Sequence, residues 1–305
     1  MERLTVDIII PVYRPDEKYI RLLQGLKKQT YPIQNIIIMN TERKYYESDR
    51  YPKLPNIEIH HISKSEFDHG GTRNQGVQYS HSDIVLFLTQ DAVPVDHHLV
   101  ENIIKPFDDQ AVGAVYGRQI PTPDCDRIER FSRSFNYPSE SFKKSKQDLE
   151  RLGIKTFFCS NVCAAYRRSV YDELGGFPLH TIFNEDMIFT GGLIKAGYTV
   201  AYEADARVVH SHNYSGIQQF HRNFDLAVSQ ADNPQIFSGV RSESEGIRLV
   251  KDTVRYLSRK RNYLQIVKLI YISGCKYMGY LLGKRYKKLP KKFVIWCSMN
   301  KEYWK

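Results

Sequence analysis

The sequence predicts an α/β fold built on a mostly parallel sheet with helices on both faces, because short apolar runs alternate with amphipathic stretches along most of the chain. The 305 residues, 42% of them apolar, suffice for one large domain or one domain with an appendage. Residues 241–305 hold 17 Lys or Arg and 4 Asp or Glu, a net charge of +13. Since the whole chain has a net charge of +10, residues 1–240 have a net charge of +10 − 13 = −3. No nucleic-acid-binding surface is therefore expected in residues 1–240.

The elements follow in order from the N-terminus. Residues 6–12 form a β-rich apolar run, and Asp16 can cap a helix over residues 16–29 with its apolar side chains along one face. Further strands are predicted at residues 35–39, 57–62, 84–88 and 112–116, with helices at residues 72–80 and 97–105. Residues 121–157 are polar and aromatic, which indicates either an excursion that lines a site or a flexible loop. Beyond them, regular structure is expected to return at residues 162–167, strands are predicted at residues 198–202 and 207–210, and helices at residues 187–196 and 217–230.

The five cysteines are an odd number without C-x-x-C spacing, which favours reduced thiols in a cytosolic protein. Cys159 and Cys163 have no second pair of ligands to complete a metal site, so we expect both to be buried and to pack as small hydrophobic residues. The N-terminus lacks the apolar stretch of a signal peptide, and no window reaches about 18 uninterrupted apolar residues. We therefore expect the protein to stay on the cytoplasmic side of the membrane.

Asp91 is the first candidate functional residue, because it follows the apolar run at residues 84–88. Its carboxylate should lie at the carboxyl edge of the sheet, where ligands of open α/β sheets bind. Hard oxygen ligands suit Mg²⁺ or Mn²⁺, so a carboxylate there can hold a cation against a diphosphate. On spacing alone, an Asp that ends a strand by starting a turn is the commoner case.

Five segments in a fixed order narrow the interpretation: Ile-Ile-Ile-Pro-Val-Tyr at 8–13, Phe-Asp-His-Gly-Gly-Thr-Arg-Asn at 67–74, Thr-Gln-Asp at 89–91, Asn-Glu-Asp at 184–186 and His-Ser-His at 210–212. In this order, over roughly residues 5–230, the chain resembles the inverting glycosyltransferases of family 2, which have the GT-A fold. The second and last segments look most like bacterial rhamnosyltransferases of that family. The resemblance implies a Rossmann-like GT-A catalytic domain over residues 1–240, followed by a basic helical extension over residues 241–305.

A nucleotide-sugar donor site is implied at the carboxyl edge of the sheet. Several residues are expected to line it: Pro11, Tyr13 and Arg14 after the first strand, Asn40 and Glu42 after the second, Gly70, Gly71 and Arg73 at a helix start, and Thr89 and Gln90 before Asp91. The two glycines would let the backbone approach a ligand, and Arg73 offers donors to phosphate unless it is a surface residue. Residues 39–42 depart from the family, which commonly has a Ser-Thr-Asp turn there.

The resemblance makes Asp91 a ligand of Mg²⁺ or Mn²⁺. Most family members have D-x-D here, whereas this chain has Thr89 in the first position, so only Asp91 carries charge and Thr89 is left to bind a sugar hydroxyl. One histidine of the pair His210 and His212 can complete the shell, and we favour His210 over His212. A histidine hydrogen-bonded in a turn is the structural alternative.

Asp186 is implied to be the catalytic base, with Glu185 orienting the site or the acceptor. Inversion requires a single in-line displacement, in which one base takes the proton of the acceptor hydroxyl. Two acidic residues in the first turn of a helix also commonly interact favourably with the helix dipole. Without the other four segments, that explanation would be preferred.

The implied activity is transfer of L-rhamnose from dTDP-L-rhamnose to a lipid-linked saccharide in cell-envelope polysaccharide synthesis. UDP-galactose or UDP-glucose is the nearest alternative donor. A nucleotidyltransferase is disfavoured, because no Gly-rich phosphate loop bearing Lys or Arg follows the first strand. A non-catalytic subunit of a polysaccharide assembly complex is supported only by the missing first Asp.

Residues 241–305 interleave apolar and aromatic residues with Lys and Arg. Cationic and aromatic residues together suit an anionic membrane surface, so peripheral contact with the inner face of the cell membrane is expected. The alternatives are a helical hairpin packed on the catalytic domain or an oligomer contact.

Overall fold

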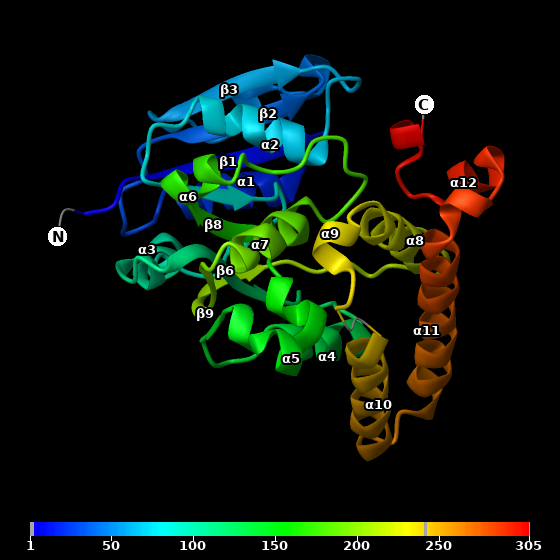
Figure 1. The fold of residues 1–305 in the computed structure, drawn as a ribbon. Coiled ribbons are helices and arrows are strands. Elements are labelled where there is room, and N and C mark those ends of the chain that lie inside the picture. Colours follow the sequence, from blue (N-terminus) through cyan, green and yellow to red (C-terminus); the bar gives the residue numbers. More distant parts are fainter. Residues whose placement is uncertain (1–2, 241–242, 305) are drawn as a thin grey trace.

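The computed structural model describes residues 3–240 and 243–304, and within them nine strands form one sheet (Figure 1). Arg241 and Lys305, the ends of the expected extension, lie outside the described residues. The strands are β1 Val6–Tyr13, β2 Ile36–Thr41, β3 Ile57–Ile62, β4 Ile84–Leu88, β5 Val93–Pro94, β6 Val112–Ile120, β7 Phe142–Lys144, β8 Cys163–Arg167 and β9 Thr199–Val209. The helices are α1 Glu17–Leu26, α2 His69–Gln78, α3 Leu99–Ile104, α4 Arg127–Asn136, α5 Leu149–Leu152, α6 Arg168–Glu173, α7 Glu185–Lys195, α8 Gly216–Asp232, α9 Pro234–Phe237, α10 Glu243–Arg259, α11 Tyr263–Lys284 and α12 Lys291–Cys297.

The sheet has the order β3-β2-β1-β4-β8-β6-β9-β5, and β7 pairs with β9. Strands β3, β2, β1 and β4 are parallel, as predicted. In the second half, β8 runs antiparallel to both β4 and β6, and β5 and β7 run antiparallel to β9, while β6 and β9 are parallel. The α/β class is confirmed, but the expectation of a mostly parallel sheet holds only for the N-terminal half.

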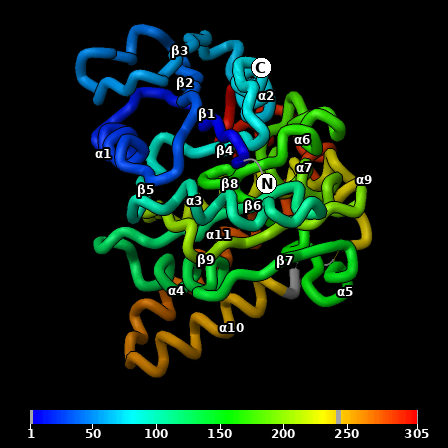
Figure 2. Tube along the Cα trace, turned by 90° about the vertical axis from the view of Figure 1, so that its left-hand side faces the viewer, coloured from blue at the N-terminus to red at the C-terminus, as the bar shows by residue number. Residues whose placement is uncertain are grey.

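Helices cover both faces of the sheet, and the alternation of side chains along β1 explains why. Ile8 and Ile10 pack into the core that contains the apolar face of α1, whereas Ile9 packs into the core on the side of α2 and α7. Figure 2 shows α1 and α2 on opposite sides of β1 and β2. Because both faces are covered, these strands are apolar throughout rather than alternating.

Several element boundaries differ from the prediction. Asp16 caps α1 as expected, since its Oδ1 accepts a hydrogen bond of 2.9 Å from the Lys18 amide, but the helix ends at Leu26 rather than near residue 29. The strands expected at residues 198–202 and 207–210 are one strand, β9. Its pairing with β6 shifts register between Gly117 and Arg118, so a bulge accommodates the polar residues that interrupt the pattern.

Residues 121–157 are an ordered excursion and not a flexible loop. They contain α4, β7 and α5, and they are fixed to the sheet by Tyr202, whose hydroxyl donates to the Pro138 carbonyl at 2.7 Å. Lys144 is buried and donates to the carbonyls of Lys155 and Phe158. Cys159 and Cys163 are free, buried thiols, as expected of small hydrophobic residues.

The basic C-terminal segment is helical and packs on the rest of the chain. Helix α11 lies along α8 at the edge of the molecule (Figure 1), and two glycines allow a close approach. A Cβ at Gly279 would overlap the carbonyl oxygen of Phe220, and one at Gly283 would overlap that of Phe224. No helix among residues 3–240 and 243–304 combines the length and apolar character needed to cross a bilayer.

Candidate active site

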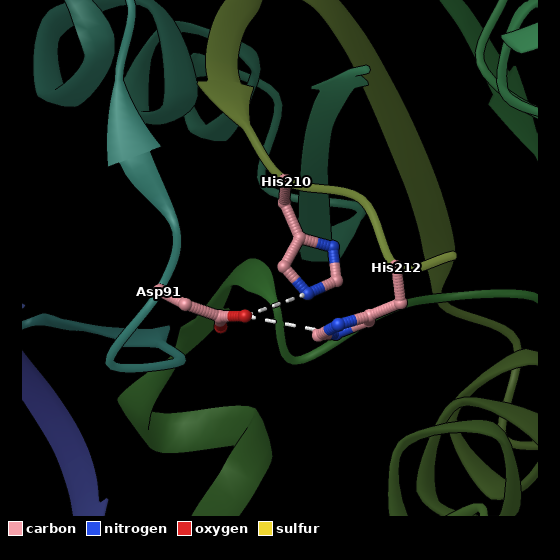
Figure 3. A group of neighbouring side chains, drawn as sticks. All are labelled: Asp91, His210 and His212. Carbon is pink, nitrogen blue, oxygen red and sulfur yellow. Dashed lines mark ion pairs between the residues drawn. The ribbon is translucent and has the colours of Figure 1, made fainter. Parts of the chain in front are cut away.

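Two distant segments bring three residues of metal-binding type together at one edge of the sheet. Asp91 lies between β4 and β5, and His210 and His212 follow β9. Both imidazoles point toward the Asp91 carboxylate (Figure 3), with Nε2 of His210 3.5 Å and Nε2 of His212 3.6 Å from Oδ2 of Asp91. The ligand atoms lie within 4.8 Å of one another, close enough for one divalent cation to bind all three. The site thus contains both histidines, not His210 alone.

Gln119, which the sequence did not single out, fixes the orientation of His210. Its Oε1 lies 2.9 Å from Nδ1 of His210 and also accepts a hydrogen bond from Arg133. Because a guanidinium can only donate, this atom of Gln119 must be the carbonyl oxygen, and Nδ1 of His210 must carry the proton. Nε2 is then left with a free lone pair on the side of Asp91. A histidine ligand that donates its other N–H to a carbonyl is typical of metal sites.

The charge states of the three residues suit a divalent cation. Burial lowers the pKa of His210 to about 3, and it also lowers that of His212, so both imidazoles are neutral near pH 7. Burial alone would raise the pKa of Asp91, but the nearby His210 and the Thr89 hydroxyl hold it below its usual value. Oγ1 of Thr89 donates to Oδ1 of Asp91 at 2.8 Å. Thr89 therefore orients the carboxylate.

Glu185 and Asp186 lie at the start of α7 beside Asn161, a second residue that the sequence did not single out; Glu185 is buried and Asp186 is half-buried. Asn184 has a φ of 65°, a left-handed conformation that Asn tolerates, and turns the chain into the helix. Oδ2 of Asp186 accepts from the Asn161 amide at 3.1 Å, and Oε1 of Glu185 accepts from Nδ2 of Asn161 at 3.1 Å. Arg73 pairs with Glu185, with NH1 3.2 Å from Oε1.

The two neighbouring acids have opposite pKa shifts. Burial and the adjacent Glu185 charge raise the pKa of Asp186 to about 7. Burial would also raise the pKa of Glu185, but Arg73 and His69 bring it below its usual value. Glu185 is thus the ionised partner of Arg73, while Asp186 can take up or release a proton near neutral pH. A carboxyl group of this kind is suited to general base catalysis.

The residues expected after β1 and β2 form a separate, more exposed group. Arg14 lies over the Tyr45 ring at 4.4 Å from its centroid and donates to the Tyr45 hydroxyl at 2.8 Å. The Tyr13 ring meets Tyr45 edge-on at 5.8 Å. Gln90 ties this turn to the end of β4, because its side-chain amide exchanges two hydrogen bonds with the Tyr13 backbone. Oε1 of Glu42 accepts from the Lys64 amide at 2.8 Å.

Four of the expected donor-binding residues have internal roles instead. Gly70 accommodates the Pro178 backbone, since a Cβ there would overlap the Pro178 carbonyl oxygen. The Gly71 amide donates to Asp68, which caps α2. Asn40 is fully buried with its side chain 2.9 Å from Nδ1 of His61, and Pro11 lies inside β1, paired with Met39. The turn after β1 begins at Arg14, because the strand continues to Tyr13.

One cleft of about 680 Å³ contains the metal-binding residues and the acid pair. Its wall includes residues that sequence reasoning did not single out: Glu129 and Arg133 of α4, Tyr214 before α8, Arg222 of α8 and Lys276 of α11. The residues of α4 come from the excursion and Lys276 from the basic extension, and nothing in their local sequence distinguishes them from surface residues. The cleft thus combines a candidate cation site, a candidate base and a cationic wall.

Comparison with known proteins supports an enzyme of one family. The family described as Glycosyl transferase family 2 matches residues 7–175. The chain is 40% identical to the O-antigen chain rhamnosyltransferase RfbN of Salmonella typhimurium, over 99% of this chain and 96% of that protein. It is 42% identical to the O-antigen chain rhamnosyltransferase WbaN of Salmonella anatum, over 97% of this chain and 95% of that protein.

The fold also matches solved glycosyltransferase structures. The mannosyltransferase PcManGT from Pyrobaculum calidifontis, in complex with GDP-Man and Mn2+, aligns with a TM-score of 0.62 over 95% of this chain and 89% of that chain, at 13% identity. S. aureus TarS in complex with UDP-GlcNAc aligns with a TM-score of 0.53 over 93% of this chain and 92% of that chain, also at 13% identity. These likenesses concern the fold, which is of the GT-A type. Together with the family match and the two Salmonella relatives, they show that the chain belongs to glycosyltransferase family 2.

Proposed function

We propose that this glycosyltransferase transfers L-rhamnose from dTDP-L-rhamnose, with inversion, to a lipid-linked saccharide in the synthesis of a cell-envelope polysaccharide. The sugar is supported by the near full-length identity of 40% and 42% to two O-antigen chain rhamnosyltransferases. The reaction type is supported by the observation that the Asp186 carboxyl group lines the same cleft as the Asp91, His210 and His212 cluster. Desolvation and the adjacent Glu185 raise the pKa of Asp186 to about 7, which suits a general base.

In the proposed reaction, Asp186 takes the proton of the acceptor hydroxyl as its oxygen attacks the anomeric carbon of the donor. The new bond forms on the face opposite the diphosphate, and the bond to the diphosphate breaks with its electron pair leaving on dTDP. The amide of Asn161 holds Asp186 in place, and Glu185 accepts a hydrogen bond from the Asn161 side chain. A divalent cation bound by Asp91, His210 and His212 would supply positive charge against the departing diphosphate. Mn²⁺ suits two neutral imidazoles better than Mg²⁺ does.

We place the nucleotide at the exposed group beside the end of β1. The rings of Tyr13 and Tyr45, the Arg14 guanidinium and the Glu42 carboxylate offer stacking and hydrogen-bonding partners for a base and ribose. Gln90 contributes by holding Tyr13. Arg73 has a buried Nε without a hydrogen-bond partner in the described part of the chain, which supports a contact with the ligand in addition to its pairing with Glu185.

We also propose that α11 lies against the membrane that carries the acceptor. Its outward face has exposed apolar side chains at helical spacing, Leu264, Val267, Ile270 and Tyr271, which are between 61% and 85% exposed. Residues 253–301 contain 13 Lys or Arg and no Asp or Glu. An apolar stripe with basic neighbours fits an anionic lipid surface.

Binding and hydrolysis of a panel of nucleotide sugars test the donor. We expect dTDP-L-rhamnose to bind in a Mn²⁺- or Mg²⁺-dependent manner and to be hydrolysed slowly without an acceptor, as measured by calorimetry and by release of dTDP. Preference for UDP-galactose or UDP-glucose would be consistent with the proposed mechanism but would contradict L-rhamnose as the transferred sugar. Failure of every nucleotide sugar to bind with either cation would contradict the proposed activity.

The pKa of Asp186 leads to a prediction about pH. A base works when ionised, so kcat/KM should fall as pH decreases through about 7. Glu185→Gln removes the neighbouring negative charge, which lowers the pKa of Asp186 and should move this acid limb down by roughly one pH unit. The measurement is kcat/KM of transfer between pH 5 and 9.

The control for the pH profile is Glu129→Gln, which removes a carboxylate that lines the same cleft but pairs with Arg133. This variant should leave the acid limb where it is in the wild type. An acid limb that stays in place in Glu185→Gln, or that moves equally in both variants, would mean that Asp186 is not the titrating base.

A further inference from the structure

Several cationic residues of the cleft are not paired with any of its carboxylates. Five cationic residues line it: Lys18, Arg73, Arg133, Arg222 and Lys276. Arg73 pairs with Glu185, and Arg133 pairs with Glu129 at 2.6 Å. Among the side chains that the structure describes, no carboxylate lies at ion-pair distance from the other three. Lys18 lines the cleft from the first turn of α1.

Arg222 and Lys276 come from α8 and α11, the pair of helices that forms the far wall of the cleft. On α8, Ile217 and Phe220 line an apolar groove on the outer side, while Arg222 lines the cleft. On α11, Cys275 and Met278 line the groove, while Lys276 lines the cleft. Helical periodicity puts the groove and cleft residues on opposite faces of each helix. Both cationic side chains are therefore directed inward by the amphipathic pattern of their helices.

The surroundings of the two cations favour an anionic ligand. Arg222 lies over the Phe183 ring at 4.4 Å from its centroid, which holds the guanidinium without neutralising it. Burial lowers the pKa of Lys276, with Arg222 and Arg133 adding to the effect and Glu129 opposing it. Removing a cation from water without an ionic partner is costly, so an incoming anion would find in Lys276 a charge that is already partly desolvated. Arginine's fork and lysine's point charge both suit phosphate oxygens.

Arg222 lies between two functional segments of the cleft. Its guanidinium carbon is 4.4 Å from the centroid of the Phe183 ring, shortly before Glu185 and Asp186, and 5.8 Å from the centroid of the Tyr214 ring, shortly after His212. Lys276 lies beyond it, toward Glu129 and Arg133 of α4. In the proposed function, a cation held by Asp91, His210 and His212 would neutralise the donor diphosphate, so Arg222 and Lys276 are not needed for that role.

We propose that Arg222 and Lys276 bind a phosphate group carried by the acceptor, so that helix α11 of the basic extension forms part of the active site. This inference rests on the proposed function in one respect, that the acceptor is attached to a carrier through phosphate. The ligand class is a phosphate or diphosphate ester. Its binding would place the acceptor hydroxyl on the Asp186 side of the cleft.

Geranyl diphosphate is the probe, titrated by calorimetry into protein already saturated with Mn²⁺ and with dTDP or UDP, whichever binds. The nucleotide occupies the donor site, so only a second phosphate site is measured. We expect the wild type to bind, and Arg222→Gln and Lys276→Gln each to weaken binding by at least about tenfold with the nucleotide Kd unchanged. Lys276→Arg should retain most of the affinity. Lys260→Gln, which removes an exposed lysine at the end of α10, should match the wild type.

Three results would overturn the inference: no binding of geranyl diphosphate once the nucleotide is bound, equal binding of geraniol, or an equal loss of nucleotide affinity in the variants. The last result would assign Arg222 and Lys276 to the donor diphosphate. Thermal unfolding of each variant shows whether it is folded. If a glutamine variant does not fold, the affinity of Lys276→Arg for geranyl diphosphate tests the inference instead. Failure of the proposed function is a separate observation, because it appears as absence of nucleotide-sugar binding or transfer by the wild type.

Discussion

Asp186→Asn is expected to lower kcat by about 10²–10⁴-fold and to leave the donor Kd within about twofold. The amide has the size of the carboxyl group but cannot take the proton of the acceptor hydroxyl. Its Oδ1 can still accept one of the two backbone hydrogen bonds, from Asn161 or Met187, that Asp186 accepts in the wild type. The measurements are the rate of sugar transfer and calorimetric titration of the nucleotide sugar.

The stability of the Asp186→Asn variant provides a control. The native pKa of about 7 lies above the ordinary value of 3.8, so the folded protein binds the proton more tightly than the unfolded chain does. Stability therefore falls as pH rises from about 4 to about 7 and stays lower above that range. The neutral amide avoids this loss, so the variant should not unfold more readily at pH 8. Full turnover in the variant, or loss of donor binding together with turnover, would contradict the base assignment.

Asp91→Ala is expected to abolish the cation dependence of donor binding and to weaken nucleotide-sugar affinity by about 10²-fold in the presence of Mn²⁺. Two neutral imidazoles remain, but without the carboxylate they hold a divalent cation poorly. Calorimetric titration of the nucleotide with and without Mn²⁺ measures the effect, and electron paramagnetic resonance of Mn²⁺ reports the free ion directly.

Two further variants sharpen the Asp91 experiment. Thr89→Val removes the hydroxyl that orients Asp91 but keeps the carboxylate, so its loss of affinity should be intermediate. Glu129→Gln removes a carboxylate of the same cleft that faces Arg133, so Mn²⁺ should still enhance nucleotide binding. If Mn²⁺ enhanced binding equally in Asp91→Ala and in the wild type, the cation would have to be held elsewhere.

The strands that are buried on both faces were predictable because their apolar composition alone identifies them. The bounds of β4 agree with the prediction, and the position of Asp91 after β4 follows directly. The bounds of the partly exposed edge strand β3 also agree. The direction of β8 was not predictable, because it depends on the path of residues 121–162 over the sheet. The same applies to α4, whose polar sequence resembles a surface loop until it packs beside the cleft.

The residues of the candidate site also fall into those that the sequence indicates and those whose role depends on tertiary contacts. Asp91, His210, Glu185 and Asp186 belong to segments that a family resemblance can indicate. The residues that adjust them cannot be found that way: Gln119 acquires its role only by contact with His210, which is 91 positions away. Asn161 likewise acts by meeting both acids of α7. Gly70 shows the opposite error, because a glycine explained by ligand approach is required by the backbone at Pro178.

The two glycines that seat α11 against α8 have a consequence for mutational surveys of this chain. Lys276 lies one turn before Gly279, so any side chain that displaces the helix at Gly279 also displaces the lysine that lines the cleft. Substitutions at Gly279 or Gly283 would thus be scored as loss of function, although neither residue touches a ligand. In a functional map these positions would be indistinguishable from binding residues. They set the distance between α8 and α11, and adding a single methyl group at either position would force the two helices apart.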